Sequence, residues 1–365
     1  MNPSGATDDG GPTDELLRQL ADLSGPLDAA QAWPGEQFRL LARAGVLADV
    51  IPHEFGGTDI SPRKLLDGYR RLAAACLTTT FVLTQRNGAC QRIAGSSNEL
   101  LRRELLPRLA RGEIFATVGI SHLTTSRQHW RQPAVQVERA DDGFLFEGEV
   151  PWVTGAPHAD FIVTGGTLAD GRQVLAAIPT DLAGVEVGPP ARLLALGGSH
   201  TSSVQLRRVS VPERWLIAGP VEQVMKQGAG GGTGSLATSA LAVGLSSAAI
   251  DHLRNEASRR PDLVEILVPL ETERDELSQL LAQAVEGTGE APEPAFSTES
   301  IRGRANSLAL RSTQALLAAS KGAGFVAGHF AERAVREAMF FLVWSCPQPV
   351  VNAALREFAG ISACS

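Results

Sequence analysis

Four cysteines are the first candidates for metal or disulfide chemistry, and their spacing argues against both. They are Cys76, Cys90, Cys346 and Cys364. None of them forms a Cys-x-x-Cys pair, and no histidines accompany them at zinc-ligand spacing. The thiols therefore predict neither a structural zinc site nor a disulfide framework, and we expect no bound metal.

A run of glycines from Gly228 to Gly234 invites comparison with a phosphate-binding loop. The run fits neither Gly-x-x-x-x-Gly-Lys-Ser/Thr nor Gly-x-Gly-x-x-Gly, and no β-rich run closely precedes it. A glycine-rich segment is flexible, so we interpret 221–234 as a linker between domains.

The overall composition disfavours nucleic-acid-binding and membrane-spanning proteins. The chain has 365 residues, 44% of them hydrophobic and 20% charged, with a formal net charge of −7. An acidic balance without a basic patch disfavours nucleic-acid binding. The polar start has no apolar signal core, and no later segment approaches the roughly 18 uninterrupted apolar residues of a membrane span. We expect a cytoplasmic protein with a disordered stretch at 1–13, no nucleic-acid partner and no membrane partner.

The order of predicted elements indicates an α+β protein. Apolar residues at helical spacing predict a helical domain over 14–113, with a loop at 51–62 and one long, largely buried helix at 65–83. Short runs of alternating polarity predict a central antiparallel β domain over 114–220. Asp-Asp-Gly at 141–143 predicts a hairpin between two of these runs.

Helical spacing returns in the last part of the chain and predicts a helical bundle over 235–365. The expected helices lie at 235–257, 269–287, 298–320, 330–343 and 350–359.

This order, with three local sequences, resembles the acyl-CoA dehydrogenase superfamily of flavoproteins. IPHEFGG (51–57) is similar to the family's loop after its second helix, ELLPRLARGE (104–113) to its entry into the β domain, and LGGSHTSSVQLRRVSVP (196–212) to its exit. The resemblance covers nearly the whole chain. It implies an FAD-linked oxidoreductase whose C-terminal bundle forms a homodimer or homotetramer.

The resemblance also implies flavin contacts. Trp152, Val153 and Thr154 match a Trp-Ile-Thr signature in which the tryptophan packs near the isoalloxazine and the threonine bonds its N5 edge. A flat aromatic ring and a hydroxyl beside a redox ring control its solvent access and hydrogen bonds. A tryptophan that simply fills the core is the alternative. The family's flavin-contacting segment falls on Ile120 and Ser121, and the residues that follow depart from its pattern.

Two further matches concern the flavin of a neighbouring subunit. Arg260 falls where the family's arginine holds the pyrophosphate, which suits a charge-assisted, bidentate contact. Gly322 and Gly324 belong to a partial match to the family's glycine loop, where small residues let the backbone approach a dinucleotide. Lys321 lies in the same loop, where its side chain either adds positive charge near the dinucleotide or is simply solvated. These matches favour FAD over FMN.

The carboxylate that family dehydrogenases use as a base is missing. The α-proton of an acyl thioester is weakly acidic, so its removal needs a positioned, desolvated base. Ungapped alignment of 336–347 places Ser345 on the family's glutamate and Cys346 on the glycine after it. Gly234 occupies the position that other members use instead.

Three residues are candidates for the catalytic group in place of the missing carboxylate. Cys346 would need a cation or helix end to lower its pKa, and otherwise fills the core. Ser345 has no base beside it in the sequence. His122, next to Ser121, suits flavin monooxygenases of this architecture, which lack the glutamate and receive reduced flavin from a separate reductase. The alternative is a structural histidine.

Other polar side chains receive simpler interpretations. We expect Tyr69, Gln85 and Arg86 to face a pocket, and Glu332 and Glu337 to pair with neighbouring arginines on a solvated helix face.

Three functions stay open. The first is an acyl-CoA dehydrogenase-like enzyme with a non-standard base, acting on an acyl thioester or related small molecule and served by an electron-transfer flavoprotein. The second is a monooxygenase served by a flavin reductase. The third is a non-catalytic binding or assembly scaffold.

Overall fold

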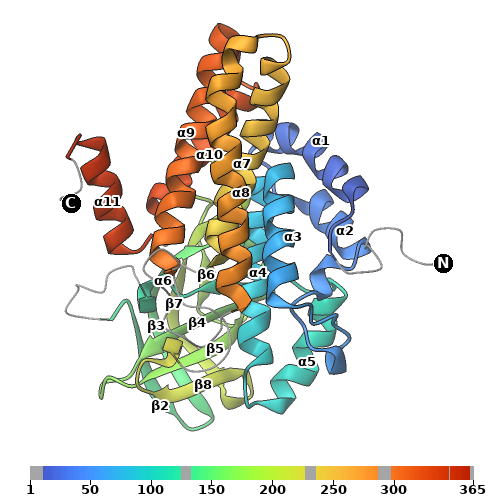
Figure 1. Ribbon diagram of the computed structural model, residues 1–365. Helices are drawn as coiled ribbons and strands as arrows, with labels where there is room; N and C mark the ends of the chain where they lie inside the picture. The colour runs from blue at the N-terminus through green and yellow to red at the C-terminus, as the bar shows by residue number, and fades with distance from the viewer. Residues whose placement is uncertain (1–10, 125–132, 227–235, 287–296, 345, 362–365) are drawn as a thin grey trace.

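The structure is a computed structural model that describes residues 11–124, 133–226, 236–286, 297–344 and 346–361. A helical N-terminal part, a β-sheet and a long helical bundle follow one another along the chain, and the bundle rises away from the sheet (Figure 1). One apolar core lies among the helices, and a second joins the sheet to α4 and α5. Most of the predicted linker and residue Ser345 lie outside the described residues.

The N-terminal helices are α1 (Asp14–Ala30), α2 (Gly35–Arg43), α3 (Pro62–Ala75), α4 (Leu77–Ala94) and α5 (Glu99–Ala110). The prediction of one helix over 65–83 is wrong, because the chain becomes extended at Cys76 (φ −154°, ψ 101°) between α3 and α4. The Thr80 hydroxyl donates to the Cys76 carbonyl at 2.8 Å, and the Thr79 hydroxyl lies 3.1 Å from the Cys76 thiol. These contacts stabilise the start of α4 at the break.

The central sheet is ordered β6-β7-β3-β2-β4-β5-β8, with β1 on β4. Its strands are β1 (Ala116–Gly119), β2 (Val135–Ala140), β3 (Gly143–Val153), β4 (Phe161–Thr167), β5 (Gln173–Pro179), β6 (Val185–Val187), β7 (Ser202–Pro212) and β8 (Leu216–Val221). Most neighbours are antiparallel, as predicted, but β1 and β2 each pair with β4 in parallel. The sheet is therefore mixed.

The predicted hairpin is confirmed. Ala140 of β2 pairs with Gly143 of β3 across a two-residue turn. Gly143 has φ +140°, and a Cβ there would overlap the Val211 carbonyl oxygen of β7. The turn thus needs glycine both for its backbone and for the close approach of β7.

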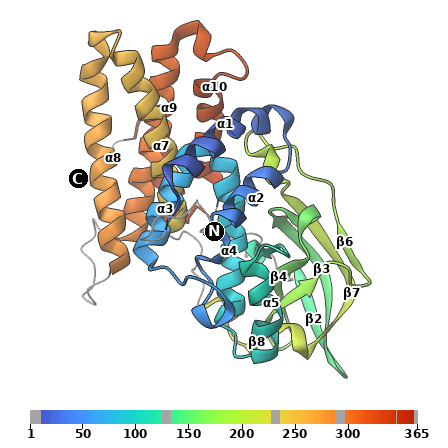
Figure 2. The same ribbon diagram turned by 90° about the vertical axis from the view of Figure 1, so that its right-hand side faces the viewer.

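The bundle contains α7 (Leu236–Ala257), α8 (Val264–Glu286), α9 (Thr298–Gly324), α10 (Phe330–Val343) and α11 (Gln348–Phe358). Helix α8 starts five residues before the predicted one and carries Pro269 inside it. Among the described helices α7 alone is long and apolar enough to cross a membrane, but 72% of its most apolar window is buried inside the protein. Figure 2 shows α7 enclosed by α3, α8 and α9.

A glycine sets the distance between α3 and α7. A Cβ on Gly244 of α7 would overlap the Arg70 carbonyl oxygen of α3 and lie 2.8 Å from the Ala73 Cβ. The two backbones therefore touch where they cross, and the spacing of α3 and α7 depends on this contact.

Substituting Gly244→Val should lower the free energy of unfolding by about 1–3 kcal/mol, because the side chain must push α3 and α7 apart. Chemical denaturation would measure the change. Gly303→Ala in α9 is the control, since nothing lies within 4 Å of a Cβ there; it should leave stability unchanged or raise it by up to about 1 kcal/mol. Equal effects of the two variants would contradict the packing role of Gly244.

Candidate active site

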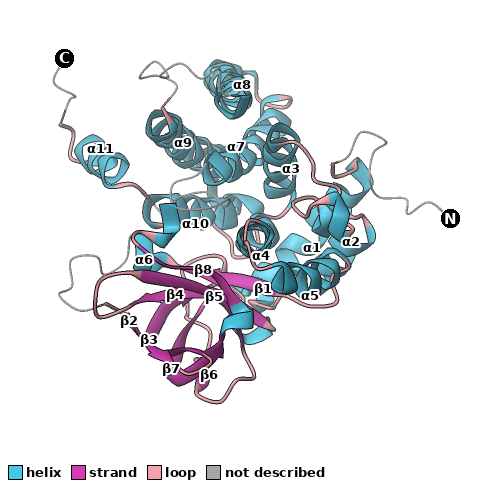
Figure 3. Ribbon diagram, turned by 90° about the horizontal axis from the view of Figure 1, so that it is seen from below, coloured by secondary structure: helices cyan, strands magenta, loops and turns pink. Residues whose placement is uncertain are grey.

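Two cavities meet where the sheet approaches α4 and α10. Figure 3 shows α6 (Ser121–Thr124) between the sheet and α10 in this region. The helical cavity has a volume of about 410 Å³ and is bounded by α3, α4 and α7. The loop cavity has a volume of about 540 Å³ and is bounded by the 193–196 loop and α10. Both are lined by the same five residues, here called the shared wall: Phe81, Ser121, Trp152, Phe340 and Trp344.

Aromatic contacts fix the helical side of the shared wall. The Phe81 ring of α4 lies 4.8 Å from that of Phe340 and 4.7 Å from that of Trp344, both edge-on. Phe340 and Trp344 stack at 5.5 Å on the same side of α10. Edge-to-face and offset pairs of this kind each add about 0.5–1.5 kcal/mol beyond area burial, so α10 is held against α4 at this point.

The predicted flavin-contacting residues lie on the β-domain side of the wall. Trp152, near the end of β3, is 45% exposed and borders both cavities, so it does not simply fill the core. Ile120 borders the helical cavity, directly after β1. Ser121 borders both cavities, and its hydroxyl is buried with no hydrogen-bond partner among the described residues. An unsatisfied buried hydroxyl costs about 1–3 kcal/mol, so this group fits a ligand with a polar edge.

Val153 and Thr154 lie behind the wall. Both are buried, and the Thr154 hydroxyl is 3.1 Å from that of Thr201, which is itself 2.9 Å from that of Ser199. Thr201 borders the loop cavity. Thr154 therefore reaches the cavity through Thr201, a residue that the sequence pattern did not single out.

His122 points away from the cavities. Its Nε2 lies 2.9 Å from the Gly165 carbonyl oxygen of β4, and it is not among the described residues that line either cavity. His129, the other histidine of this segment, lies outside the described residues. The structure therefore places His122 as an anchor between α6 and the sheet.

The residues predicted to reach a neighbour's flavin form a second group. The Arg260 Nη1 donates to the Ala319 carbonyl at 2.8 Å, which joins it to the end of α9 that holds Gly322 and Gly324. Lys321 has φ 54° and breaks the helical path there. Figure 1 shows this end of the bundle far from the sheet. The two predicted groups thus lie at separate places on one chain.

Cys346 has an environment that favours the neutral thiol. It is half-buried, and the Asn306 Nδ2 approaches its Sγ at 3.8 Å. Burial raises the thiol pKa, and the nearby Arg302 opposes this only in part. Arg302 is fully buried and donates to the Trp344 carbonyl at 2.9 Å. Cys346 does not line either cavity among the described residues, and Ser345 is not described.

The lining of the two cavities holds few groups for acid–base chemistry. Among the described residues, no Asp, Glu, His or Cys lines either one. Tyr69 and Gln85 border the helical cavity, as expected, and burial raises the pKa of Tyr69. Arg86 borders neither of these two cavities; it is buried, donates to the Leu47 carbonyl at 2.7 Å and lines a separate cavity of about 180 Å³. No group of three or more His, Cys, Asp or Glu able to hold a metal occurs in the described part.

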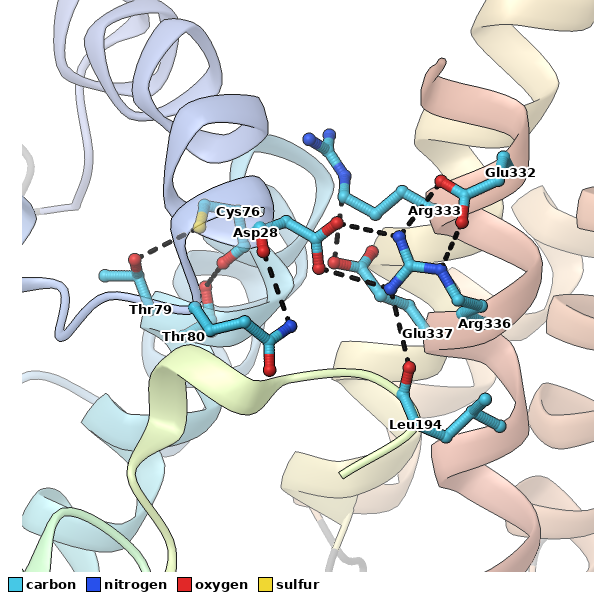
Figure 4. Close-up of polar contacts among 10 residues, drawn as sticks. Asp28, Cys76, Thr79, Thr80, Leu194, Glu332, Arg333, Arg336 and Glu337 are labelled. Carbon is cyan, nitrogen blue, oxygen red and sulfur yellow. Dashed lines mark hydrogen bonds and ion pairs between the residues drawn. The ribbon is translucent and has the colours of Figure 1, made fainter. Parts of the chain in front are cut away.

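A charged cluster is centred on Arg336, which lines the loop cavity (Figure 4). The Arg336 guanidinium of α10 contacts the Asp28 carboxylate of α1 at 2.7 Å and the carboxylate of Glu332. It also lies 3.5 Å from the Leu194 carbonyl oxygen, in the loop that bounds the cavity. The cluster therefore joins α1, α10 and this loop, while two carboxylates compensate the arginine's charge.

The structure contradicts the prediction that Glu337 lies on a solvated helix face. Glu332 pairs with Arg336 as expected, but Glu337 is only 3% exposed and does not lie on a solvated face. Its nearest cation is Arg333, with Nε 3.8 Å from the carboxylate. Burial, with a smaller contribution from Asp28, raises the pKa of Glu337 to about 7 despite the two arginines.

Comparison with known proteins finds sequence similarity to both dehydrogenases and monooxygenases. Residues 15–113 match the model of the acyl-CoA dehydrogenase N-terminal domain. A probable acyl-CoA dehydrogenase of Bacillus subtilis, YngJ, is 24% identical over 65% of this chain and 64% of its own length. HsaA of Mycobacterium tuberculosis, the oxygenase subunit of a flavin-dependent monooxygenase, is 24% identical over 56% of this chain and 49% of its own length. The matched region thus spans between half and two thirds of these relatives.

The fold extends over the whole chain. The solved complex of glutaryl-coenzyme A dehydrogenase with glutaryl-CoA superimposes with a TM-score of 0.75, covers 97% of both chains and is 17% identical. At this identity the likeness shows the fold, and it confirms the predicted arrangement of helical domain, β domain and helical bundle.

The raised pKa of Glu337 predicts how the stability of the protein changes with pH. Because its folded-state pKa lies above the ordinary 4.5, its contribution to stability is complete below about pH 4.5 and is lost as pH rises through 7. Glu337→Gln stays neutral, so its stability relative to the unsubstituted protein should rise by up to about 3 kcal/mol between pH 4.5 and 8. Urea denaturation at several pH values would measure the difference, and a difference that does not vary with pH would contradict it.

Proposed function

The chain belongs to the acyl-CoA dehydrogenase superfamily, and from that premise we propose that it is a flavin-dependent oxidoreductase that holds FAD against the shared wall. The Ser121 hydroxyl, which has no partner in the described part of the chain, and the exposed Trp152 ring are the groups that fit a polar-edged, flat ring. Bound FAD would supply two-electron redox chemistry. Trp152 would cover one side of the ring and exclude water, while Ser121 and the Thr154–Thr201 hydroxyls would bond its polar edge.

The reaction that the site supports best is oxygenation of a small, mostly apolar substrate. One observation carries this choice: in the part of the chain that the structure describes, no carboxylate lines either cavity. Ordinary α,β-desaturation needs such a base, whereas oxygenation with reduced flavin does not need to remove an α-proton. The similarity to a monooxygenase oxygenase subunit supports the same choice, and a flavin reductase would then be the partner.

Dehydrogenation of an acyl thioester is the second candidate, supported by the similarity to a probable acyl-CoA dehydrogenase. It would need Ser345 or Cys346 to act in place of the glutamate. The raised pKa of Cys346 weighs against that role, because a neutral thiol is a poor base. An electron-transfer flavoprotein would be the partner of this reaction.

A second copy of the chain would complete the FAD site. The exposed apolar residues Phe325 (80%) and Val326 (62%) adjoin the end of α9 where Arg260 and Gly322 lie. Exposed apolar side chains beside a basic group suit contact with another protein surface and a phosphate. We therefore propose a homodimer or homotetramer in which one copy's Arg260 reaches the pyrophosphate held by the other.

Two flavin assays test the reaction. With chemically reduced FAD and oxygen, the protein should incorporate one oxygen atom into an apolar substrate; under anaerobic conditions, acyl-CoA thioesters should not bleach bound FAD. Bleaching with an acyl-CoA would instead establish dehydrogenation. A protein that binds neither oxidised nor reduced flavin would be a non-catalytic scaffold.

Ser121→Ala tests the placement of the flavin. In FAD-free protein the change should leave stability unchanged or raise it, because the hydroxyl has no partner among the described residues. It should weaken FAD binding about 5- to 10-fold, measured by fluorescence titration. Ser278→Ala in α8, whose hydroxyl donates to the Arg274 carbonyl, is a control that should not affect FAD affinity. Unchanged FAD affinity in Ser121→Ala would place the flavin elsewhere.

Phe325→Asp tests the proposed assembly. It should shift the protein toward monomers in sedimentation velocity and release FAD on dilution, because a charge would replace an apolar contact at the interface. Leu100→Asp, at another exposed apolar position, is the matched control. A monomeric protein that retains FAD would contradict the shared site.

A further inference from the structure

A fully buried arginine has N–H groups that no described residue accepts. Arg302 of α9 is 0% exposed, and its Nη2 donates to the Trp344 carbonyl at 2.9 Å. Its Nε and Nη1 are buried without a hydrogen-bond partner among the described residues. Burial lowers the pKa of Arg302 to about 10, so the guanidinium stays charged at neutral pH. A buried cation with unused N–H groups costs free energy, and an anion beside it would recover part of that cost.

Asn306 adds a second polar group to the same face of α9. It lies four residues after Arg302, so the two side chains project from one side of the helix. The buried Asn306 Nδ2 donates to the Phe341 carbonyl at 2.9 Å and lies 3.8 Å from the Cys346 Sγ. Its Oδ1 has no partner in the described part of the chain. Helix α9 therefore presents a cation and an amide to the segment that carries Trp344 and Cys346.

Cys346 is the group on this segment that can become a lasting anion. It is half-buried, so a small solute reaches it from solvent. Burial raises the pKa of the thiol, while Arg302 and Asn306 oppose this in part, and the thiolate in turn favours the charged arginine. The thiol is thus mostly neutral and leaves the buried cation without a counter-ion. A sulfinic acid is a much stronger acid than a thiol, so it would be ionised at neutral pH and offer two oxygen acceptors.

We propose that Cys346 is an oxidation site, at which Arg302 and Asn306 hold the sulfinate that hydrogen peroxide produces. The thiolate sulfur attacks one peroxide oxygen: an S–O bond forms, the O–O bond breaks, and the departing hydroxide takes up the thiol's proton to become water. The product is a sulfenic acid. A second peroxide repeats this two-electron oxidation and gives the sulfinate, a proton and a second water. The oxidant comes from solution and no flavin takes part, so the inference does not depend on the proposed function.

Two other thiols serve as internal controls. Cys76 and Cys90 are fully buried, and burial raises the pKa of both. Arg86 lies near Cys90, but its Nη groups already donate to the Leu47 and Leu109 carbonyls. Neither thiol therefore combines access from solvent with an arginine that has unused donors, and both should stay reduced in the folded protein.

Peptide mapping by mass spectrometry after exposure to hydrogen peroxide tests the oxidation. All proteins carry Cys364→Ser, because Cys364 lies outside the described residues. Cys346 should gain two oxygen atoms, whereas Cys76 and Cys90 should gain none. Arg302→Met should slow the reaction about 10-fold, because the cation no longer favours the thiolate. Arg304→Met is the matched control on the same helix: its side chain is 37% exposed and pairs with Glu276, and the rate should not change.

A charged substitution tests the anion site without an oxidant. Cys346→Asp places a carboxylate where the sulfinate would lie, and Cys346→Asn places a neutral amide of the same size there. The Asp variant should have the higher midpoint of thermal denaturation, because its carboxylate pairs with Arg302. This difference should disappear or reverse when Arg302→Met is added. Since the two variants are compared with each other, the result holds even if both are less stable than the unsubstituted protein.

Three results would overturn the proposal: Cys346 that stays reduced in peroxide, oxidation that is equally fast in Arg302→Met, or an Asp variant no more stable than the Asn variant. If Arg302→Met does not fold, the first result and the comparison of Asp with Asn still decide. None of these measurements uses flavin, so a protein inactive in both flavin assays would give the same results.

Discussion

The contact of Phe81 with Phe340 and Trp344 is the interaction on which the rest of the site depends. It holds α10 against α4 and separates the space between helices and sheet into two cavities. Aromatic rings occupy this position without bringing charge or water, so the wall is rigid and apolar. The β domain supplies the rest of the wall. There, Trp152 and the Ser121 hydroxyl, for which the described residues offer no hydrogen-bond partner, are the features that a flat, polar-edged cofactor would use.

Charge is distributed differently on the two sides of this wall. At the loop cavity, Arg336 is compensated by carboxylates from α1 and α10, and the cluster works as a structural tie between elements distant in sequence. At the helical cavity, Arg92 is buried, borders the cavity and donates to the Gly88 carbonyl of its own helix. The two arginines therefore differ in their contacts: Arg336 joins separate elements, whereas the hydrogen bond from Arg92 to Gly88 lies within α4.

Local signals in the sequence were sufficient for the hairpin and for the order of elements, because Asp-Asp-Gly turns and helical periodicity act within a few residues. They failed where side-chain contacts that apolar periodicity does not show decide the backbone conformation or the burial of a residue. Cys76 becomes extended through contacts that periodicity does not show, and Glu337 is buried by packing against α1. Ser121 and His122 are adjacent in sequence, yet the turn of α6 directs the histidine toward β4 and leaves the serine at the cavities. The wall's phenylalanines resemble ordinary core residues, so no sequence signal identified them.

The separation of the two predicted flavin groups has a thermodynamic consequence. One chain holds Ser121 and Trp152 beside the sheet and Arg260 at the far end of the bundle, so a dinucleotide that uses both must bridge two copies. Binding of the cofactor and association of the copies are then linked by mass action, since each favours the state that the other requires. The two predicted flavin groups do not include the position that the family's glutamate would occupy, so the proposed linkage does not depend on that position. On this proposal, cofactor binding and assembly are independent of the residue that acts on the substrate.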